Sequence, residues 1–228
     1  MQGVFVVSQS TGRRRDASRT KSAILNAAIA EFSARGPAGT RMDEVAARAG
    51  VNKSLIYQYY GSKQELYAEA LNNVLVMITD RLTTGAKDFL SRMANEPIES
   101  ALRVLIESQL TMLETFPEYP RLMAWENLEG GRTLSRLQLQ NTYQMFLHGV
   151  TRFIKPYQEA GVISPDLDLI QFVQSIQALL HYYVIQKGTQ EYLFKLDINM
   201  RETREAWIDT VTTQLLSSLK GQKVSKST

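Results

Sequence analysis

The sequence predicts an all-α protein with about nine helices, an N-terminal three-helix domain followed by a six-helix domain. Apolar residues recur at three- and four-residue spacings through most of the chain, which is the period of one helical face. Beyond residue 70, no sustained two-residue alternation of the kind found in half-buried strands interrupts this pattern. Capping residues, Pro and Gly divide the helical segments at intervals typical of a helical bundle.

The first predicted helix starts near Ser18 and ends at Gly36-Pro37. Its apolar stripe should pack against the two following helices. That stripe consists of Ile24, Leu25, Ala28, Ile29 and Phe32. Residues 1–17 are expected to form a flexible basic arm that contains Arg13-Arg14-Arg15. Two interpretations of this arm stay open, a solvated tail or an arm that reaches into a neighbouring minor groove.

Residues 40–67 carry the strongest local signal in the chain. Thr40 and Asp43 form a capping-box-like pair, so a helix should begin there. Gly50 follows that helix where a positive φ is needed, and Asn52 then occupies the N-cap position of a new helix. Two helices joined by a short turn that contains Gly form a helix-turn-helix.

The second helix of this motif, Lys53–Tyr60, divides into an apolar face and a polar face. The first residues of a recognition helix reach base edges in the major groove. Lys pairs with guanine and Ser with several base edges, whereas Tyr hydroxyls commonly donate to phosphate, so Lys53, Ser54 and Tyr57 are candidates. Lys63, in the first turn of the next helix, is a natural phosphate clamp.

Several short stretches match a known family in order along residues 20–70. They are Ile24-Leu25-Asn26-Ala27-Ala28 with Phe32 and Gly36, Thr40 to Gly50-Val51, and Ile56-Tyr57-Gln58-Tyr59-Tyr60 with Ser62-Lys63. This region resembles the DNA-binding domain of the tetracycline-repressor (TetR-like) family of bacterial one-component regulators. The resemblance implies a homodimer that binds a palindromic double-stranded DNA operator, with a C-terminal helical domain that binds a small-molecule effector.

The resemblance also implies which residues face DNA. Together with the residues above, it yields the candidate DNA-binding set Thr40, Arg41, Lys53, Ser54, Leu55, Tyr57, Tyr59 and Lys63. Met42-Asp43 stands where the family often has Val or Ile followed by Arg. The acidic Asp43 argues against a phosphate contact at that point.

Composition and charge fit a protein that meets phosphate at one end. Residues 1–70 carry 10 Lys and Arg against 6 Asp and Glu, whereas residues 71–228 carry 16 against 17. The chain has no cysteine, which excludes disulfides, thiolate catalysis and Cys-based metal sites. It also has no run of about 18 apolar residues, and Val4-Phe5-Val6-Val7 is too short for a signal peptide, so a cytoplasmic protein without a membrane partner is expected.

The larger domain should contain six helices, and the sequence predicts them at residues 62–90, 97–116, 121–128, 133–160, 164–187 and 199–219. Ser62 with Glu65 and Asn199 with Glu202 should cap the first and the last of them. Gly188 should stop the fifth. The expected division is a helix-turn-helix domain at 18–65, a ligand-binding and dimerisation domain at 66–220, and a flexible tail at 221–228.

Aromatic and Met residues concentrate in residues 112–131 and on the helices expected to surround them. Such side chains, with a few polar groups, commonly line ligand pockets, although an aromatic stripe is also ordinary core. The candidate pocket residues are Phe89, Met112, Trp125, Asn127, Tyr143, Phe146 and His181. The candidate dimer-interface residues recur at helical spacing on the last two long helices, where intrachain core is again the alternative; they are Ile170, Val173, Gln174, Gln177, Trp207, Val211 and Gln214.

An enzymatic function has little support. The two histidines lie on separate predicted helices and lack the neighbours that a metal site needs, and the chain has no nucleophile elbow and no complete glycine-rich phosphate loop. We therefore expect no catalysis, no cofactor and no metal. A repressor released by its effector is the leading interpretation. The alternatives are an activator and a ligand-blind DNA-organising dimer.

Overall fold

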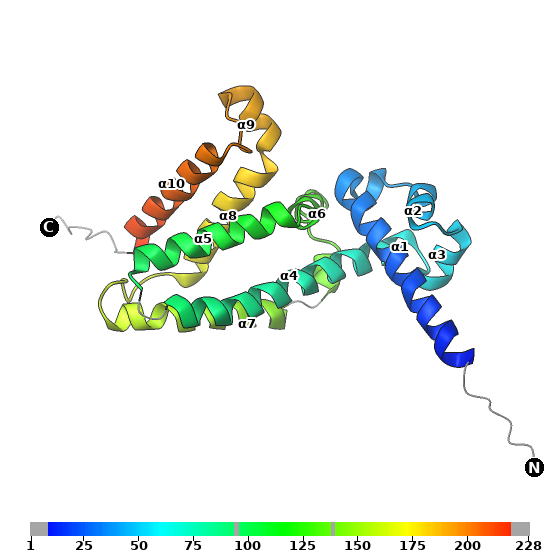
Figure 1. The fold of residues 1–228 in the computed structure, drawn as a ribbon, viewed down its shortest axis with the longest axis horizontal. Helices are drawn as coiled ribbons and strands as arrows, with labels where there is room; N and C mark the ends of the chain where they lie inside the picture. The colour runs from blue at the N-terminus through cyan, green and yellow to red at the C-terminus, as the bar shows by residue number, and fades with distance from the viewer. Residues whose placement is uncertain (1–8, 94–95, 138–139, 220–228) are drawn as a thin grey trace, which may run out of the picture. The chain divides into compact units, whose positions relative to one another are not determined.

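The computed structural model describes residues 9–93, 96–137 and 140–219, and these residues are all-α (Figure 1). They form ten helices and one 3₁₀ turn, so the predicted fold class is confirmed with one helix more than expected. Two compact units emerge. One comprises the described parts of Met1–Met77 and Arg121–Gln138, and the other comprises Ile78–Pro120 and the described part of Leu139–Thr228. The expected domain boundary after residue 65 therefore falls inside a helix.

The first unit holds the N-terminal helices, the start of α4, and α6 except for its first three residues, Glu118–Pro120. Its helices are α1 (Gln9–Gly39), α2 (Met42–Ala49), α3 (Lys53–Tyr60), α4 (Lys63–Met93, which continues into the second unit), α6 (Glu118–Leu128) and the turn η1 (Leu134–Arg136). Side chains from all five of these α-helices meet in its core, among them Ile24, Phe32, Val45, Ile56, Leu66 and Leu122. The Phe32 ring packs edge-on against Tyr67, with 5.1 Å between centroids.

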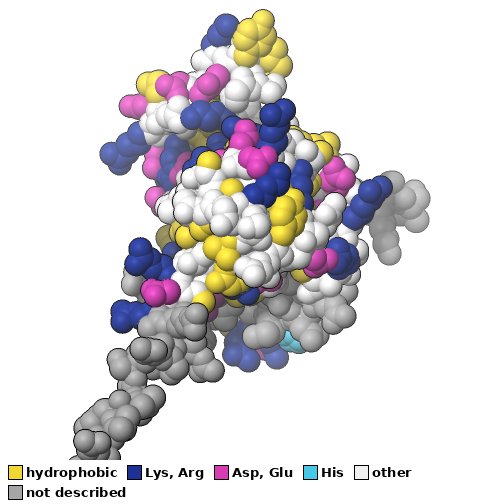
Figure 2. Space-filling view, turned by 90° about the vertical axis from the view of Figure 1, so that its right-hand side faces the viewer, with side chains coloured by type: hydrophobic (Ala, Val, Ile, Leu, Met, Phe, Trp, Pro, Cys, Tyr) yellow, Lys and Arg dark blue, Asp and Glu magenta, His cyan; other side chains and the backbone are white. Residues whose placement is uncertain are grey.

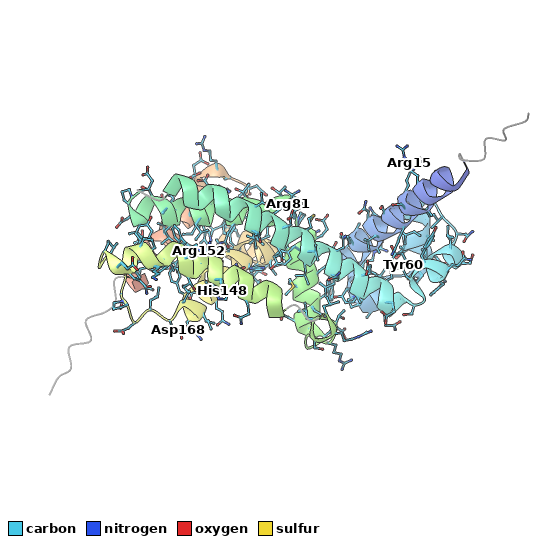
Figure 3. All side chains as sticks on the ribbon, turned by 90° about the horizontal axis from the view of Figure 1, so that it is seen from below. Arg15, Tyr60, Arg81, His148, Arg152 and Asp168 are labelled. Atoms are coloured by element: carbon cyan, nitrogen blue, oxygen red, sulfur yellow. The ribbon has the colours of Figure 1, made fainter. Side chains whose placement is uncertain are left out.

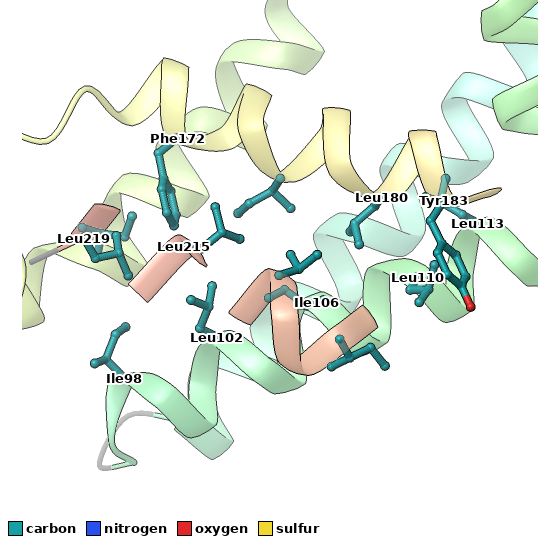
Figure 4. Close-up of a cluster of buried hydrophobic side chains, with 14 of the residues drawn as sticks. Ile98, Leu102, Ile106, Leu110, Leu113, Phe172, Leu180, Tyr183, Leu215 and Leu219 are labelled. Atoms are coloured by element: carbon teal, nitrogen blue, oxygen red, sulfur yellow. The ribbon is translucent and has the colours of Figure 1, made fainter. Parts of the chain in front are cut away.

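The second unit is a helical bundle built around α5, α8 and α10. Its helices are α5 (Ile98–Thr115), α7 (Gln140–Glu159), α8 (Leu169–Ile185), α9 (Lys187–Phe194) and α10 (Arg201–Leu219). Figure 4 shows the core, where apolar side chains of α5, α8 and α10 interdigitate. Leu110 on α5, Leu180 on α8 and Val211 on α10 are all fully buried there. Buried apolar area of this kind is the main favourable term in folding.

Some helix boundaries differ from the predictions. α1 begins at Gln9, so Arg13–Arg15 lie on a helix instead of in a flexible arm. Residues 9–17 contain no Pro, and Arg13–Arg15 and Ala17 are residue types with high helix propensity, which allows the helix to extend. α8 begins at Leu169, and not at residue 164 as predicted, because the Asp168 carboxylate accepts a hydrogen bond from the backbone N–H of Gln171 at 3.1 Å.

The region between the last two long helices was also predicted incorrectly. Gly188 does not stop a helix; it lies inside α9, which follows α8 after a break at Gln186. Asn199 does not cap α10, because its Oδ1 accepts a hydrogen bond from the Lys187 ammonium at 2.6 Å. The segment predicted as one helix over 133–160 contains η1 and then α7, which starts at Gln140.

Candidate nucleic-acid interface

The turn between α2 and α3 forms as the sequence predicts. Gly50 adopts a left-handed conformation with φ 67° at the end of α2. The N–H of Val51 donates to Ala46 O at 3.1 Å, which closes a Schellman-type C-cap. Asn52 Oδ1 accepts from the N–H of Leu55 at 2.8 Å and thereby caps α3. The predicted caps at Gly50 and Asn52 are confirmed, and together they fix the direction in which α3 leaves the turn.

Thr40 requires a correction. Its side chain is 2% exposed, and its hydroxyl donates to the backbone oxygens of Gly36 at 2.8 Å and Glu31 at 3.1 Å. α2 starts at Met42, with Arg41 at the cap position and no capping side chain. Thr40 therefore fastens the end of α1 to the start of α2 and does not present its hydroxyl to DNA, whereas Arg41 is exposed.

α3 has one buried face and one exposed face. Ile56 and Tyr60 point into the core of the unit. The hydroxyl of Tyr60, which Figure 3 labels, donates to Lys21 O at 3.1 Å. Burial, followed by the charge of Glu69, raises the pKa of Tyr60 to about 12. These two residues fix the rotation of α3 about its axis.

The exposed face of α3 gathers most of the predicted DNA-binding residues. Lys53, Ser54, Tyr57 and Tyr59 are all exposed, and Leu55 is half-buried. The two tyrosines are 39% and 36% exposed, so their hydroxyls are accessible to a ligand. Four hydrogen-bonding side chains on an exposed short helix match what base and phosphate contacts require.

The cations around this face are held by neighbouring groups. The Lys53 ammonium lies 3.1 Å from the Asp43 carboxylate. Lys63 Nζ donates to Ala38 O at 3.3 Å, and the Ser62 hydroxyl accepts from the N–H of Glu65 at 3.1 Å, which confirms Ser62 as the cap of α4. In the face of the molecule shown in Figure 2, Lys and Arg are interspersed with Asp and Glu.

A contact between α1 and α6 was not predicted from the sequence. Gly36 has φ 71° and ψ 170°, and the Trp125 indole lies so close that a Cβ on Gly36 would be 2.7 Å from it. Trp125 Nε1 donates to Ser33 O at 3.2 Å. Trp125 was predicted to face a ligand, but the structure shows it packed against α1 within the DNA-binding unit. Asn127, the neighbouring prediction, is exposed.

A buried polar pair lies next to this contact. The Glu126 side chain is 0% exposed, and its Oε2 accepts from the N–H of Leu134 at 2.7 Å. Glu126 Oε1 and the Tyr67 hydroxyl have no hydrogen-bond partner among the described residues. Burial, and then the negative charges of Glu126 and Glu129, raise the pKa of Tyr67, so its hydroxyl stays protonated. The Tyr67 hydroxyl on α4 is thus a donor, and Glu126 Oε1 on α6 an acceptor, each without a partner among the described residues.

The remaining pocket candidates fall into two groups. The side chains of Phe89, Tyr143 and Phe146 lie outside the described residues. Met112 and His181 are half-buried in the second unit, His181 beside the ring of Tyr119 with 5.7 Å between centroids. Burial lowers the pKa of His181, so the imidazole is neutral at neutral pH.

A polar cluster surrounds His181 inside the helical bundle. Gln177 Nε2, one turn earlier on α8, donates to the buried Gln109 Oε1 on α5 at 3.2 Å. His181 Nδ1 lies 2.9 Å from Gln177 O, and burial raises the pKa of Tyr119. Two amides, an imidazole and a phenol thus lie where a bundle ordinarily packs apolar side chains.

The dimer-interface candidates differ in whether they are buried in their own chain or exposed. Val173 and Val211 are buried in the core of their own unit, so they correct the prediction and cannot face a partner. Trp207 stacks on Tyr183 with 5.4 Å between centroids. Gln177 is occupied by Gln109 as described above. The exposed candidates are Ile170, Gln174 and Gln214.

The capped turn, the two-faced α3 and the exposed polar residues define a helix-turn-helix DNA-binding protein. Residues 24–70 match the family described as bacterial regulatory proteins, tetR family, and residues 99–213 match the tetracyclin repressor-like C-terminal domain. The chain belongs to the TetR family of helix-turn-helix transcriptional regulators, which are not enzymes.

Two relatives and one solved structure are similar to this chain over most of its length. The transcriptional repressor SCO4008 of Streptomyces coelicolor is 31% identical over 171 residues, 75% of this chain and 81% of the relative. The repressor NicS of Pseudomonas putida is 26% identical over 91% of this chain and 96% of its own length. The solved structure of FadR from Bacillus subtilis in complex with stearoyl-CoA has a TM-score of 0.62 at 18% identity, covering 87% of this chain and 98% of that one, which supports the fold.

Two further observations concern membrane spans and metal sites. Across residues 9–93, 96–137 and 140–219, no helix is long and apolar enough to span a bilayer. Within the same ranges, no group of three or more His, Asp or Glu side chains is arranged to hold a metal ion.

Proposed function

We propose that this protein is a ligand-responsive repressor that binds a palindromic operator as a homodimer and is released by a small-molecule effector. The observation that carries the proposal is the exposed polar face of α3, held in place by Asn52 and by the buried Ile56. Its relatives SCO4008 and NicS are named as repressors, which supports repression over activation. In this proposal Lys53 and Ser54 read bases, while Tyr57, Tyr59 and Lys63 contact phosphates.

In the proposed homodimer, the interface is formed by one stripe of residues on α8 and one on α10. Of the predicted interface residues, the stripes keep Ile170, Gln174 and Gln214. Both stripes are exposed and uncharged. On α8 the stripe is Ile170, Gln174, Ala178, Tyr182 and Ile185, and on α10 it is Ala206, Thr210, Gln214 and Ser217. Two helices from each copy can form a four-helix bundle across a twofold axis. Two recognition helices about 34–36 Å apart would then read successive major-groove turns.

Two substitutions separate base reading from phosphate binding. Lys53→Ala should weaken binding to the operator by roughly 1–3 kcal/mol and leave binding to unrelated DNA much less affected, because a base contact is lost. Lys63→Ala should weaken binding to both duplexes equally and reduce the slope of log affinity against log salt by about 1. Fluorescence anisotropy with the two duplexes measures both effects. Equal losses on both duplexes for Lys53→Ala would show that Lys53 contacts phosphate instead.

The proposed effector site is the polar cluster of Gln109, Gln177, His181 and Tyr119 in the second unit. A neutral imidazole with one nitrogen at a backbone carbonyl leaves the other as a hydrogen-bond acceptor. On α4, the Arg81 guanidinium lies 4.2 Å from the centre of the Phe116 ring, which follows α5. α4 and α6 contribute residues to both units, so a ligand that shifts either helix can change operator affinity.

Gln109→Met tests this site, since it removes the amide while keeping the volume nearly constant. We expect the free energy of unfolding to fall by no more than about 1–3 kcal/mol, because methionine fills the same space while the half-buried Gln177 amide loses its acceptor. We expect the small-molecule filtrate of a host cell extract to release the wild type from operator DNA and to release the variant much less. The matched control is Gln144→Met at an exposed position of α7, which should respond like the wild type. A Gln109→Met protein released as readily as the wild type would place the effector elsewhere.

A further inference from the structure

One acidic residue of the DNA-binding unit, Asp43, forms an ion pair with Lys53, which we propose reads bases. Asp43, in the first turn of α2, has its carboxylate 3.1 Å from the Lys53 ammonium in the first turn of α3. The two side chains are 75% and 45% exposed, so the pair is open to solvent and to an approaching ligand. The ion pair thus lies on the surface that α3 presents.

Other acids of this unit are engaged with cations that the DNA proposal does not use. Glu31 is buried and pairs with Arg35 and Arg48, and Glu44 also pairs with Arg35. The pairs Glu31–Arg48 and Arg35–Glu44 join α1 to α2, whereas Glu31–Arg35 lies within α1. Asp43 differs because its partner, Lys53, belongs to the recognition helix.

We propose that Asp43 is a specificity-determining residue, which holds the Lys53 ammonium away from phosphates and releases it only to a base edge with two acceptors. This inference rests on the proposed function, because it assigns a role to Lys53 at the same interface. On unrelated DNA the ion pair stays closed, so Lys53 neutralises no phosphate and the Asp43 carboxylate repels the backbone. On the operator, guanine O6 and N7 replace the carboxylate.

The relative strengths of the ion pair, a base contact and a phosphate contact favour release of Lys53 to a base and not to a phosphate. An exposed ion pair stabilises by no more than roughly fivefold in equilibrium constant. A good bidentate contact to the correct base is worth roughly 5- to 150-fold in discrimination, enough to open the pair. A single phosphate contact is weakened by salt and has no matching second acceptor, so it competes poorly with a carboxylate already in place. Asp43 therefore lowers binding to unrelated DNA more than binding to the operator.

Asp43→Asn tests the proposal with purified full-length protein, its upstream DNA and a scrambled duplex across a salt series. We expect affinity for the scrambled duplex to rise roughly two- to fivefold, with a slope of log affinity against log salt steeper by about 0.9, because Lys53 gains a phosphate contact. Operator affinity should rise less, so the ratio of operator to scrambled affinity falls. Glu69→Gln, the same charge change at an exposed position of α4, is the matched control and should leave that ratio unchanged.

A double substitution distinguishes action through Lys53 from general repulsion. In a Lys53→Ala background, Asp43→Asn should change scrambled-duplex affinity no more than Glu69→Gln does, and the extra salt dependence should vanish. An equal gain with and without Lys53, or an unchanged salt slope, would overturn the proposal. Failure of the proposed function would look different: the wild type itself would not distinguish the two duplexes, while the slopes on the scrambled duplex would still report on the ion pair.

Discussion

Gly36→Ala is expected to lower the free energy of unfolding of the DNA-binding unit by about 2–6 kcal/mol. Gly36 has φ 71° and ψ 170°, a region of backbone conformation that is essentially restricted to glycine. The added methyl would also lie 2.7 Å from the Trp125 indole, which is wedged against α1 and bonded to Ser33 O. Strain and overpacking therefore act at the same point. Urea unfolding followed by far-UV circular dichroism measures the loss, and the same signal serves for variants that lack Trp125.

Two comparisons isolate the cause. Gly39→Ala, close by in the sequence, places its Cβ no closer than 3.5 Å to another atom, so it should leave stability nearly unchanged or slightly improved. In a Gly36→Ala/Trp125→Ala protein the clash is gone, so the combined loss should be smaller than the sum of the two single losses. If Gly36→Ala were as stable as Gly39→Ala, the close packing of α6 on α1 would not hold in solution.

Ala178→Glu is expected to reduce operator affinity on the order of 100-fold or more. Ala178 is exposed in the middle of the uncharged stripe on α8, so a glutamate there should not disturb the fold of its own chain. Across a twofold axis the same position recurs on the partner, and two carboxylates brought together without water repel each other strongly. A monomer then holds only one half-site. Analytical ultracentrifugation and anisotropy measure the two losses together.

Ser108→Glu is the matched control, since Ser108 is an exposed position on α5 and receives the same charge. It should leave both the dimer and operator binding as in the wild type. Reduced operator binding by Ala178→Glu without any change in mass would remove α8 from the proposed interface. A dimer that also keeps wild-type affinity would do the same.

The helix-turn-helix could be predicted from the sequence because its determinants are local. Gly50 and Asn52 act on groups within a few residues of themselves, so their caps can be recognised without a structure. The polar and apolar faces of α3 follow from helical spacing in the same way. By contrast, the burial of Thr40 depends on a bend at Gly36, which the spacing of apolar residues does not reveal.

Contacts between segments far apart in the chain explain the remaining errors. Gly36 and Trp125 each have an ordinary local interpretation, as a helix end and as an aromatic in a Met-rich segment, and only the fold brings them together. On α8 and α10, both faces carry residues that suit a buried position. Spacing alone therefore could not show that Val173 and Val211 belong to the core of their own chain, while Ala178 remains exposed.

Binding of the purified protein to its own upstream DNA and to a scrambled duplex, across a salt series and with stoichiometry determined, tests the central claim most directly. The account predicts a saturable complex with two protomers per operator and an affinity at least about 10³-fold higher than for the scrambled duplex. Equal and steeply salt-dependent binding to both duplexes would contradict it and indicate a DNA-binding protein without sequence preference. Absence of binding to either duplex would contradict the assignment of α3 as a recognition helix.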